Sequence, residues 1–278
     1  MANVYALDQN YFRRGGLERV IAEDPKAKFV ILDVAFLEMA KGEHWKKTIQ
    51  GSLAKLAKTP GRILGAISLS EALRHEMEKL EHGSLSLVCK DHTRYYRALA
   101  TELASNDPDG PLLQQLEADL PAAQENLKRD ELNHEKNLSR LQETTQAVKH
   151  HLGPDNLKHL KQPTCTNAER LSLAYFAATR FAQDLLIKEG HPPARIRRFL
   201  RGNPLFLRYQ LALVRHAMEW AIKGGIESLT PEKATNDVID QHYVVVGSFF
   251  DGLFSYDERV RLADQELRFM LSLKNPMI

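Results

Sequence analysis

The sequence predicts an α/β fold with a three-layer α/β/α core around a parallel sheet, interrupted by a large all-helical insertion. Three observations support this fold class. The first forty residues alternate short apolar runs with amphipathic segments, the β-α-β-α order typical of a parallel sheet with right-handed crossovers. A short apolar run returns near the C-terminus. Between these parts, from about residue 93, the chain is charged, helical in its periodicity and poor in β-branched residues.

The N-terminal elements follow one another closely. Residues 4–7 are an apolar run that ends at Asp8, too short for a helix and therefore predicted as a buried strand. A helix follows and stops at Pro25. Residues 29–32 are predicted as the second strand, and the next helix carries Glu38. The N-terminal part therefore supplies two strands, each followed by a helix with an acidic residue near it.

The next segment is predicted to add a third strand. Residues 43–60 have apolar side chains at helical spacing, and residues 63–67 form another apolar run. Ser68 and Glu71 then have the spacing of a capping box, in which the side chain of the third helical residue bonds back to the cap. This makes Glu71 a capping residue in preference to a catalytic one.

The helical part is predicted to span residues 86–229, inserted into a core formed by residues 1–85 and 230–278. Apolar residues alternate at spacings of three and four along 134–152, which is typical of the seam of a helical hairpin or short coiled coil over 112–152. An antiparallel pair within one chain is favoured over a dimerising coiled coil. Basic helices are expected over about 194–223.

The stretch from Asn236 to Asp257 contains both kinds of element. Asp237 and Asp240 are expected to open a late helix, and residues 252–254 are predicted as a short buried strand. Asp257 follows where that strand ends. The plain alternative is a helix capped by Asn236 or Asp237, followed by a solvated aspartate in a turn. In the other interpretation, these carboxylates reach the C-terminal edge of the sheet, where open α/β folds place ligands.

Composition narrows the class of protein. The chain is 43% hydrophobic and 27% charged, as expected of a globular protein, and no apolar run or N-terminal signal predicts a membrane segment. The two cysteines, Cys89 and Cys165, lack paired spacing, which argues against a disulfide framework and a thiolate zinc site. A cytoplasmic location is the default expectation. The net charge of +2 means that a nucleic-acid partner would need a local basic patch.

The densest basic cluster in the sequence lies after residue 193. Four arginines alternate with apolar residues there, and Arg208 follows on a later predicted helix. Such a surface can bind nucleic-acid phosphates, although it can also be a solvated helix face paired with acids. The predicted nucleic-acid-binding residues are Arg195, Arg197, Arg198, Arg201 and Arg208.

Five carboxylates are candidates for one site at the sheet edge. Crowded carboxylates repel one another, and a hard divalent cation with oxygen ligands resolves the repulsion. Mg²⁺ or Mn²⁺ also keeps waters that can attack a phosphodiester. The candidate catalytic residues are Asp8, Glu38, Asp237, Asp240 and Asp257.

These residues, in this order, resemble a PIN-like nuclease. The matching motifs are Asp8 with Asn10 after the first strand, Glu38 on the helix after the second, Asp240 with Tyr243 and Gly247, and Ser255 with Asp257 after the last strand. The match covers about residues 1–85 and 230–278, and the long helical insertion departs from the compact family pattern. Asp237 competes with Asp240 for the third position. Asp33 and Glu71 compete with Glu38 for the second.

The resemblance implies a metal-dependent endonuclease, with RNA favoured over DNA, whose metal ligands are Asp8, Glu38, Asp240 and Asp257. Asn10 and Ser255 would orient ligands or water. The insertion would grip the substrate or a protein partner, and self-association is left open. A role as a toxin or antiphage effector follows only by analogy with the family. The alternative function is a non-catalytic regulatory module that binds nucleic acid or protein through the helical insertion.

Overall fold

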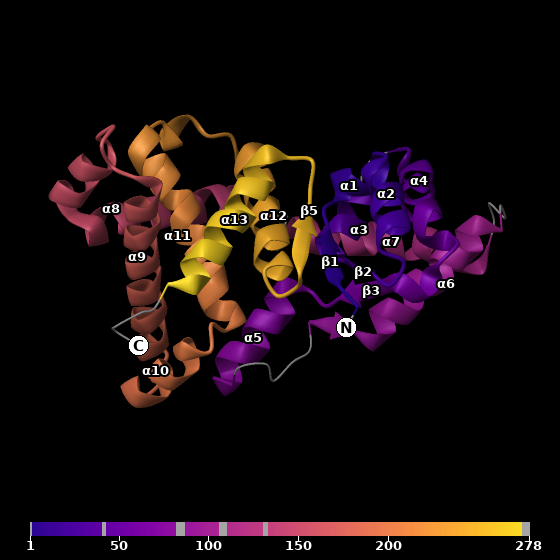
Figure 1. Ribbon diagram of the computed structural model, residues 1–278, viewed down its shortest axis with the longest axis horizontal. Helices are drawn as coiled ribbons and strands as arrows, with labels where there is room; N and C mark the ends of the chain where they lie inside the picture. The colour runs from indigo at the N-terminus through magenta and orange to yellow at the C-terminus, as the bar shows by residue number, and fades with distance from the viewer. Residues whose placement is uncertain (1, 41–42, 82–86, 106–109, 130–132, 274–278) are drawn as a thin grey trace. The chain divides into compact units, whose positions relative to one another are not determined.

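The computed structural model describes residues 2–40, 43–81, 87–105, 110–129 and 133–273. It confirms the α/β class, with a five-stranded sheet in the order β4-β3-β2-β1-β5 (Figure 1). Contacts divide the chain into two compact units. Unit 1 comprises Met1–Ala72, Ser86–Asp130 and Val246–Arg261, and unit 2 comprises Leu73–Leu85, Glu131–Val245 and Leu262–Ile278.

The sheet belongs to unit 1 and is mostly parallel. The strands are β1 (Val4–Leu7), β2 (Lys28–Ile31), β3 (Ile63–Ala66), β4 (Val88–Cys89) and β5 (Gly252–Phe254). β1 lies between β2 and β5 and is parallel to both, so these three strands end at the same edge of the sheet. The antiparallel edge strand β4 was not predicted, because two residues are too few to show a strand periodicity.

Helices of unit 1 pack on one another and on the sheet. They are α1 (Gln9–Arg13), α2 (Gly16–Glu23), α3 (Asp33–Met39), α4 (Trp45–Ala57), α6 (Lys90–Ala104) and α7 (Pro111–Arg129), with the 3₁₀ turn η1 (Pro60–Arg62). α4 buries Ile49, Leu53 and Leu56, as its spacing predicts. α6 lies so close to β3 that a Cβ on Gly65 would come within 2.7 Å of the backbone of His92. Only glycine therefore permits this approach of helix to strand.

Unit 2 is helical. It contains α8 (His134–Leu160), α9 (Asn167–Lys188), α10 (Pro193–Arg201), α11 (Leu205–Lys223), the 3₁₀ turn η2 (Ile226–Ser228), and most of α5 (Leu69–Lys79), α12 (Pro231–Gly247) and α13 (Glu258–Ser272). α11 packs against α8 and α9. The predicted seam of α8 is buried at Leu141, Thr145, Val148 and Leu152. Its periodicity therefore marks a core-facing stripe.

The packing differs from the predicted hairpin and domain boundaries. α8 packs against α11 and α9 in unit 2, whereas α7 packs against α6 in unit 1, so each helix of the expected pair over 112–152 has other partners. Contacts also place α6 with the sheet, although the predicted insertion began at residue 86, a position outside the described residues. The cause is the packing of α6 on β3, which helical periodicity alone cannot reveal. In the part of the chain that the structure describes, no helix combines the length and hydropathy of a membrane span.

Candidate functional site

Asp8 lies at the C-terminal edge of the sheet, directly after the central strand β1. Its backbone N–H donates to the carbonyl of Phe254 at 3.0 Å, which extends the pairing of β1 with β5. Its carboxylate caps α1, with Oδ1 accepting from the N–H of Asn10 at 3.2 Å. Only 3% of the residue is exposed. The sequence therefore buries a carboxylate where a strand ends and a helix begins.

Ser255 links Asp8 to Asp257. The serine hydroxyl donates to Oδ2 of Asp8 at 2.5 Å and accepts from the N–H of Asp257 at 3.0 Å. Asp257 in turn caps α13, because its Oδ1 accepts from the N–H of Arg259 at 2.7 Å. The guanidinium of Arg259 lies 3.6 Å from the other oxygen of Asp257. One hydroxyl thus joins the carboxylate of Asp8 to the backbone of Asp257.

The electrostatics of Asp8 are those of a buried anion beside another anion. Burial raises the pKa of Asp8 above its ordinary value, and the charge of Asp257 adds to the increase, whereas hydrogen bonds from Ser255 and Asn10 oppose it. Among the described residues, no lysine, arginine or histidine forms an ion pair with Asp8. Keeping Asp8 ionised therefore costs free energy that a bound cation would offset.

The second position of the predicted set has two half-buried candidates in unit 1. Asp33 follows the end of β2 and begins α3, where its Oδ1 accepts from the N–H of Val34 at 2.8 Å. Glu38 lies more than one turn further along the same helix. At the rival Glu71 the backbone N–H donates to the hydroxyl of Ser68 at 3.1 Å, so Ser68 caps the helix, and the Glu71 side chain is exposed. Parallel pairing thus places Asp33 nearest to the strand edge that carries Asp8.

Asp237 and Asp240 do not open a helix, which corrects the predicted boundary. α12 begins at Pro231, and Thr230 accepts from the N–H of Lys233 at 3.3 Å. Both aspartates therefore lie inside α12, in unit 2. Proline at the first helical position explains the earlier start, because its missing N–H is not needed there. Convergence of Asp240 with the unit 1 carboxylates stays a prediction.

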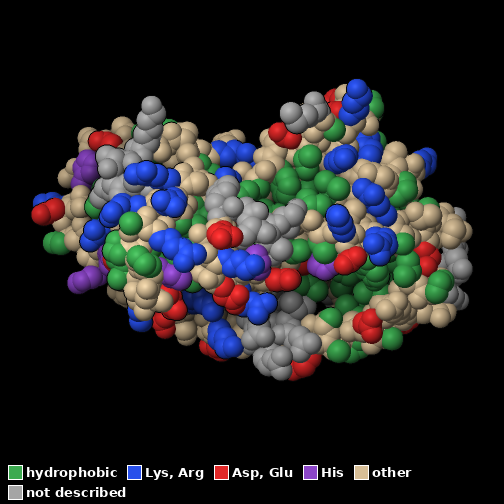
Figure 2. Space-filling model, turned by 90° about the horizontal axis from the view of Figure 1, so that it is seen from below, with side chains coloured by type: hydrophobic (Ala, Val, Ile, Leu, Met, Phe, Trp, Pro, Cys, Tyr) green, Lys and Arg blue, Asp and Glu red, His purple; other side chains and the backbone are tan. Residues whose placement is uncertain are grey.

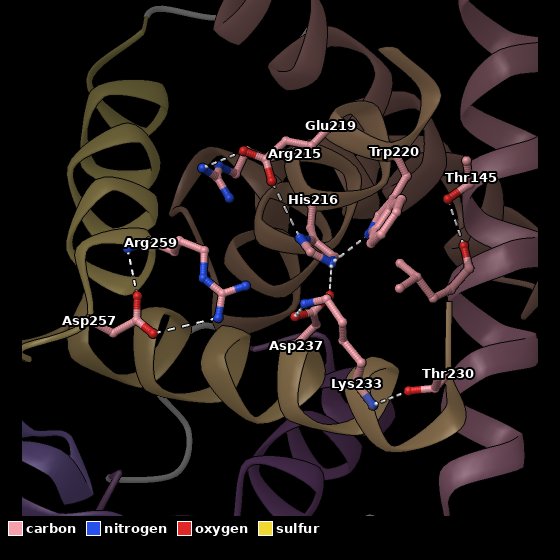
Figure 3. Close-up of polar contacts among 11 residues, drawn as sticks. Thr145, Arg215, His216, Glu219, Trp220, Thr230, Lys233, Asp237, Asp257 and Arg259 are labelled. Atoms are coloured by element: carbon pink, nitrogen blue, oxygen red, sulfur yellow. Dashed lines mark hydrogen bonds and ion pairs between the residues drawn. The ribbon is translucent and has the colours of Figure 1, made fainter. Parts of the chain in front are cut away.

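Asp237 lies in a buried polar network of unit 2 (Figure 3). Its Oδ2 is 3.2 Å from Nε2 of His216, and its Oδ1 is 3.3 Å from Nζ of Lys233. Both carboxylate oxygens thus have basic partners. Burial lowers the pKa of His216, but hydrogen bonds to Asp237 and Glu219 outweigh burial, so the net pKa is raised. This geometry joins Asp237 of α12 to His216 of α11 within unit 2.

Arg215, which precedes His216 in the sequence, also forms ion pairs with acidic side chains. Arg215 is 7% exposed, and its guanidinium lies 2.6 Å from Glu266 and 3.1 Å from Glu219. It lines a cavity of about 420 Å³ whose wall is otherwise formed by residues of α9, α11 and α13. Arg208, predicted to bind nucleic acid, is half-buried and donates to the carbonyl of Asn203 at 2.9 Å. Burial lowers the pKa of Arg208 to about 10. Arg208 thus differs from the exposed arginines of α10.

The arginines of α10 lie on its solvent side. The apolar residues between them, Ile196, Phe199 and Leu200, are buried, so the helix is strongly amphipathic. Figure 2 shows the side of the molecule on which α10 lies, with Lys and Arg side chains gathered there. Arg195 donates to the carbonyl of Lys79 at 2.6 Å. The four exposed arginines are Arg195, Arg197, Arg198 and Arg201.

A search for potential metal ligands gives a different result from the sequence. Within the described ranges, the only three ligand atoms within 4.8 Å of one another belong to His159, Cys165 and Glu169. Asp8, Glu38 and Asp257, all in unit 1, do not form such a group. The sequence analysis missed the His-Cys-Glu group because it looked for paired cysteines. A histidine six residues before a cysteine, and a glutamate four after it, was the available signal.

Whether Mg²⁺ or Mn²⁺ fits the sheet edge depends on the ligand atoms that the residues there offer. Asp8 and Asp257 offer hard carboxylate oxygens, and the buried Asp8 has no charged partner of opposite sign within the described chain. Magnesium is commonly bound by one or two carboxylates together with waters, so this donor set fits it.

Comparisons of the chain with protein-family models, curated proteins and solved structures found no match.

Proposed function

We propose that the chain is a metal-dependent nuclease that hydrolyses phosphodiester bonds, with RNA favoured over DNA. The observation that carries the proposal is the buried Asp8 carboxylate at the end of the central strand, joined to Asp257 through Ser255. An anion buried beside a second anion is costly unless a cation binds there. The resemblance of the same residues to PIN-like nucleases supports the same reaction class.

The chain's own residues would have distinct tasks in this reaction. Asp8 and Asp257 would bind Mg²⁺ or Mn²⁺, which supplies an activated water and neutralises charge on the phosphodiester. Ser255 would hold the Asp8 carboxylate through its hydroxyl and the Asp257 backbone through the N–H of that residue, and the N–H of Asn10 would hold Asp8 from the α1 side. Glu38 or Asp33 would complete the ligands from unit 1.

The proposed activity is tested by incubating the purified protein with a mixed RNA sample. We expect degradation with Mn²⁺ or Mg²⁺ and none after EDTA, because chelation removes the cation from the carboxylates. Single-stranded DNA and double-stranded DNA of similar length, assayed in parallel, decide the preference for RNA. Intact RNA in every metal condition would contradict the proposal.

Removing Arg197 and Arg201 together should weaken nucleic-acid binding. The two residues are four apart on α10 and share one helical face, so a phosphate backbone can contact both. Each lost phosphate contact on a single strand reduces the slope of log affinity against log salt by about 0.7, so the double alanine variant should lose about 1.4. Binding of a fluorescent single-stranded RNA across a salt series measures this slope.

A matched control removes two exposed arginines elsewhere. Arg19 and Arg94 are 75% and 81% exposed in their side chains and lie on α2 and α6. Their double alanine variant makes the same change in net charge and should leave the slope near the wild-type value. Equal slopes for the α10 variant and the wild type would mean that α10 does not contact the backbone of the nucleic acid.

The exposed arginines of α10 also favour a second candidate function. A non-catalytic regulatory module could bind nucleic acid or an acidic protein surface through this helix. Binding that depends on Arg197 and Arg201, without cleavage in any metal, would favour this function over the nuclease. The toxin or antiphage role and self-association rest on analogy and follow from neither site.

A further inference from the structure

Three side chains of different chemistry meet where α8 ends and α9 begins. His159 is on the last turn of α8, Cys165 lies in the connection, and Glu169 is in the first turn of α9. One ligand atom of each lies within 4.8 Å of the other two. Cys165 is buried at 5% exposure, whereas the side chains of His159 and Glu169 are 41% and 51% exposed. The group thus has a fixed sulfur and an open solvent side.

The local backbone holds this group in place. The N–H of Gln162 donates to the carbonyl of His159 at 2.9 Å, and the N–H of Cys165 donates to the carbonyl of Gln162 at 3.1 Å. Two successive turns therefore return the chain to the end of α8. These turns place the backbone of Cys165 near the end of α8, and its Sγ donates to the carbonyl of Thr166 at 3.8 Å.

A capping box fixes the glutamate as well. Oε2 of Glu169 accepts from the N–H of Thr166 at 2.7 Å and from its hydroxyl at 2.8 Å. The N–H of Glu169 donates back to the same hydroxyl at 3.2 Å, and the arrangement is a capping box. The other carboxylate oxygen, Oε1 of Glu169, lies on the side of the imidazole, 3.9 Å from Nε2 of His159. The cap thus aims one carboxylate oxygen at the group.

The donor types select a class of metal. Thiolate, imidazole and carboxylate together suit Zn²⁺, whereas Mg²⁺ takes oxygen ligands. Tetrahedral Zn²⁺ bonds of 2.0–2.3 Å place neighbouring ligand atoms about 3.5 Å apart. The exposed side chains of His159 and Glu169 can close the remaining distance to the fixed sulfur. The solvent side leaves room for a water as the fourth ligand.

We propose that His159, Cys165 and Glu169 form a binding site for Zn²⁺ or a similar borderline-soft cation, which joins the ends of α8 and α9. The thiol proton is released to solvent when the thiolate binds. The site is separate from the carboxylates of the sheet edge, lies within unit 2 and does not depend on the nuclease proposal. It clamps the connection between two helices that both pack against α11.

Cobalt substitution tests the site in the full-length protein, because Co²⁺ bound to a thiolate gives a near-ultraviolet charge-transfer band. We expect the wild type to develop this band and to bind one Co²⁺ per chain, with d–d bands of tetrahedral intensity. Zn²⁺ should displace the Co²⁺ and remove the bands. Absence of the charge-transfer band in the wild type would overturn the proposal.

Variants separate this site from incidental binding. Cys165→Ser should remove the band, whereas Cys89→Ser, which alters the other cysteine, should keep it. His159→Asn and Glu169→Gln preserve the buried thiol, and the glutamine keeps the capping box, so both should fold and bind Co²⁺ at least about tenfold more weakly. A band that survives Cys165→Ser, or wild-type affinity in His159→Asn, would assign the metal to other residues.

Discussion

Replacing Asp8 with asparagine should abolish RNA cleavage while leaving the fold intact. Asparagine has the same shape, keeps one oxygen to accept from the N–H of Asn10 and can still pair with the hydroxyl of Ser255. It lacks the negative charge needed to bind a divalent cation. We expect the cleavage rate at saturating Mn²⁺ to fall by at least about 100-fold, more than the loss of a typical outer-shell partner costs. Initial rates on a labelled RNA measure the change.

The same substitution should stabilise the metal-free protein. The pKa of Asp8 is raised in the folded state by burial first and by Asp257 in addition. The folded state therefore holds this proton to higher pH than the unfolded state does. Stability consequently falls as the pH rises from the unfolded pKa near 3.8 through the raised folded pKa, and the loss persists at neutral pH. Asp8→Asn removes this penalty, so its melting temperature at pH 7 in EDTA should exceed that of the wild type.

Controls distinguish the site from a general effect of charge. Asp251 binds the N–H of Val4 at 2.7 Å, at the opposite end of β1, so Asp251→Asn should retain activity. Asp257→Asn should resemble Asp8→Asn in activity. Comparing Glu38→Gln and Asp33→Asn with Glu71→Gln identifies the second carboxylate, and we expect Glu71→Gln to keep activity because its side chain is exposed. Wild-type rates in both Asp8→Asn and Asp257→Asn would falsify the metal site at the sheet edge.

The second large effect concerns stability and the His216–Asp237 pair. Asp237→Asn should destabilise the protein by about 3 kcal/mol near pH 6, because it removes the nearer of the two carboxylate partners of a buried imidazolium. Asp237 is 4% exposed, and its nearest contact with the ring is 3.2 Å. Urea unfolding followed by circular dichroism measures the difference in the free energy of unfolding.

The pH dependence of this destabilisation follows from the pKa shifts of His216 and Asp237. The pKa of His216 is raised from 6.5, so its contribution is complete below 6.5 and is lost as the pH rises through the folded value. Burial raises the pKa of Asp237, but the larger combined effect of His216 and Lys233 lowers it, so the net pKa lies below 3.8. The contribution of Asp237 to the free energy of unfolding is therefore complete above pH 3.8. The destabilisation by Asp237→Asn should therefore be largest between about pH 4 and 6.5 and smaller at pH 9.

Trp220 provides an optical readout of the same titration. Its indole N–H lies 3.2 Å from Nε2 of His216 and can donate only when that nitrogen is unprotonated. In the protonated ring, Nε2 donates to Asp237 instead. With Trp45→Phe as background, the fluorescence of Trp220 should titrate at the raised pKa of His216, and Asp237→Asn should move that midpoint to lower pH.

An exposed pair serves as the control for burial. His151 and Asp184 lie 3.6 Å apart with side chains 31% and 53% exposed, so Asp184→Asn should change stability by less than about 1 kcal/mol. If Asp237→Asn changes stability no more than Asp184→Asn does, the buried pair has no special role in unit 2.

Local sequence patterns predicted much of the chain and placed several site residues on the right elements. The apolar runs ending at Asp8 and before Ser255 are β1 and β5, and the spacing of Ile49, Leu53 and Leu56 gives α4. These features depend on local periodicity and burial, which a sequence displays directly. Local patterns failed at α12, where Pro231 begins the helix before the two aspartates.

The sequence by itself therefore determined most of the strands and helices around the sheet edge, because these depend on near neighbours along the chain. Only the tertiary structure decided which acidic residues have cationic partners. Asp237 pairs with His216 from another helix, whereas Asp8 is buried beside Asp257 across 249 positions of sequence. The pKa of a carboxylate depends on burial and on nearby charges in space, and folding brings those charges from distant parts of the chain.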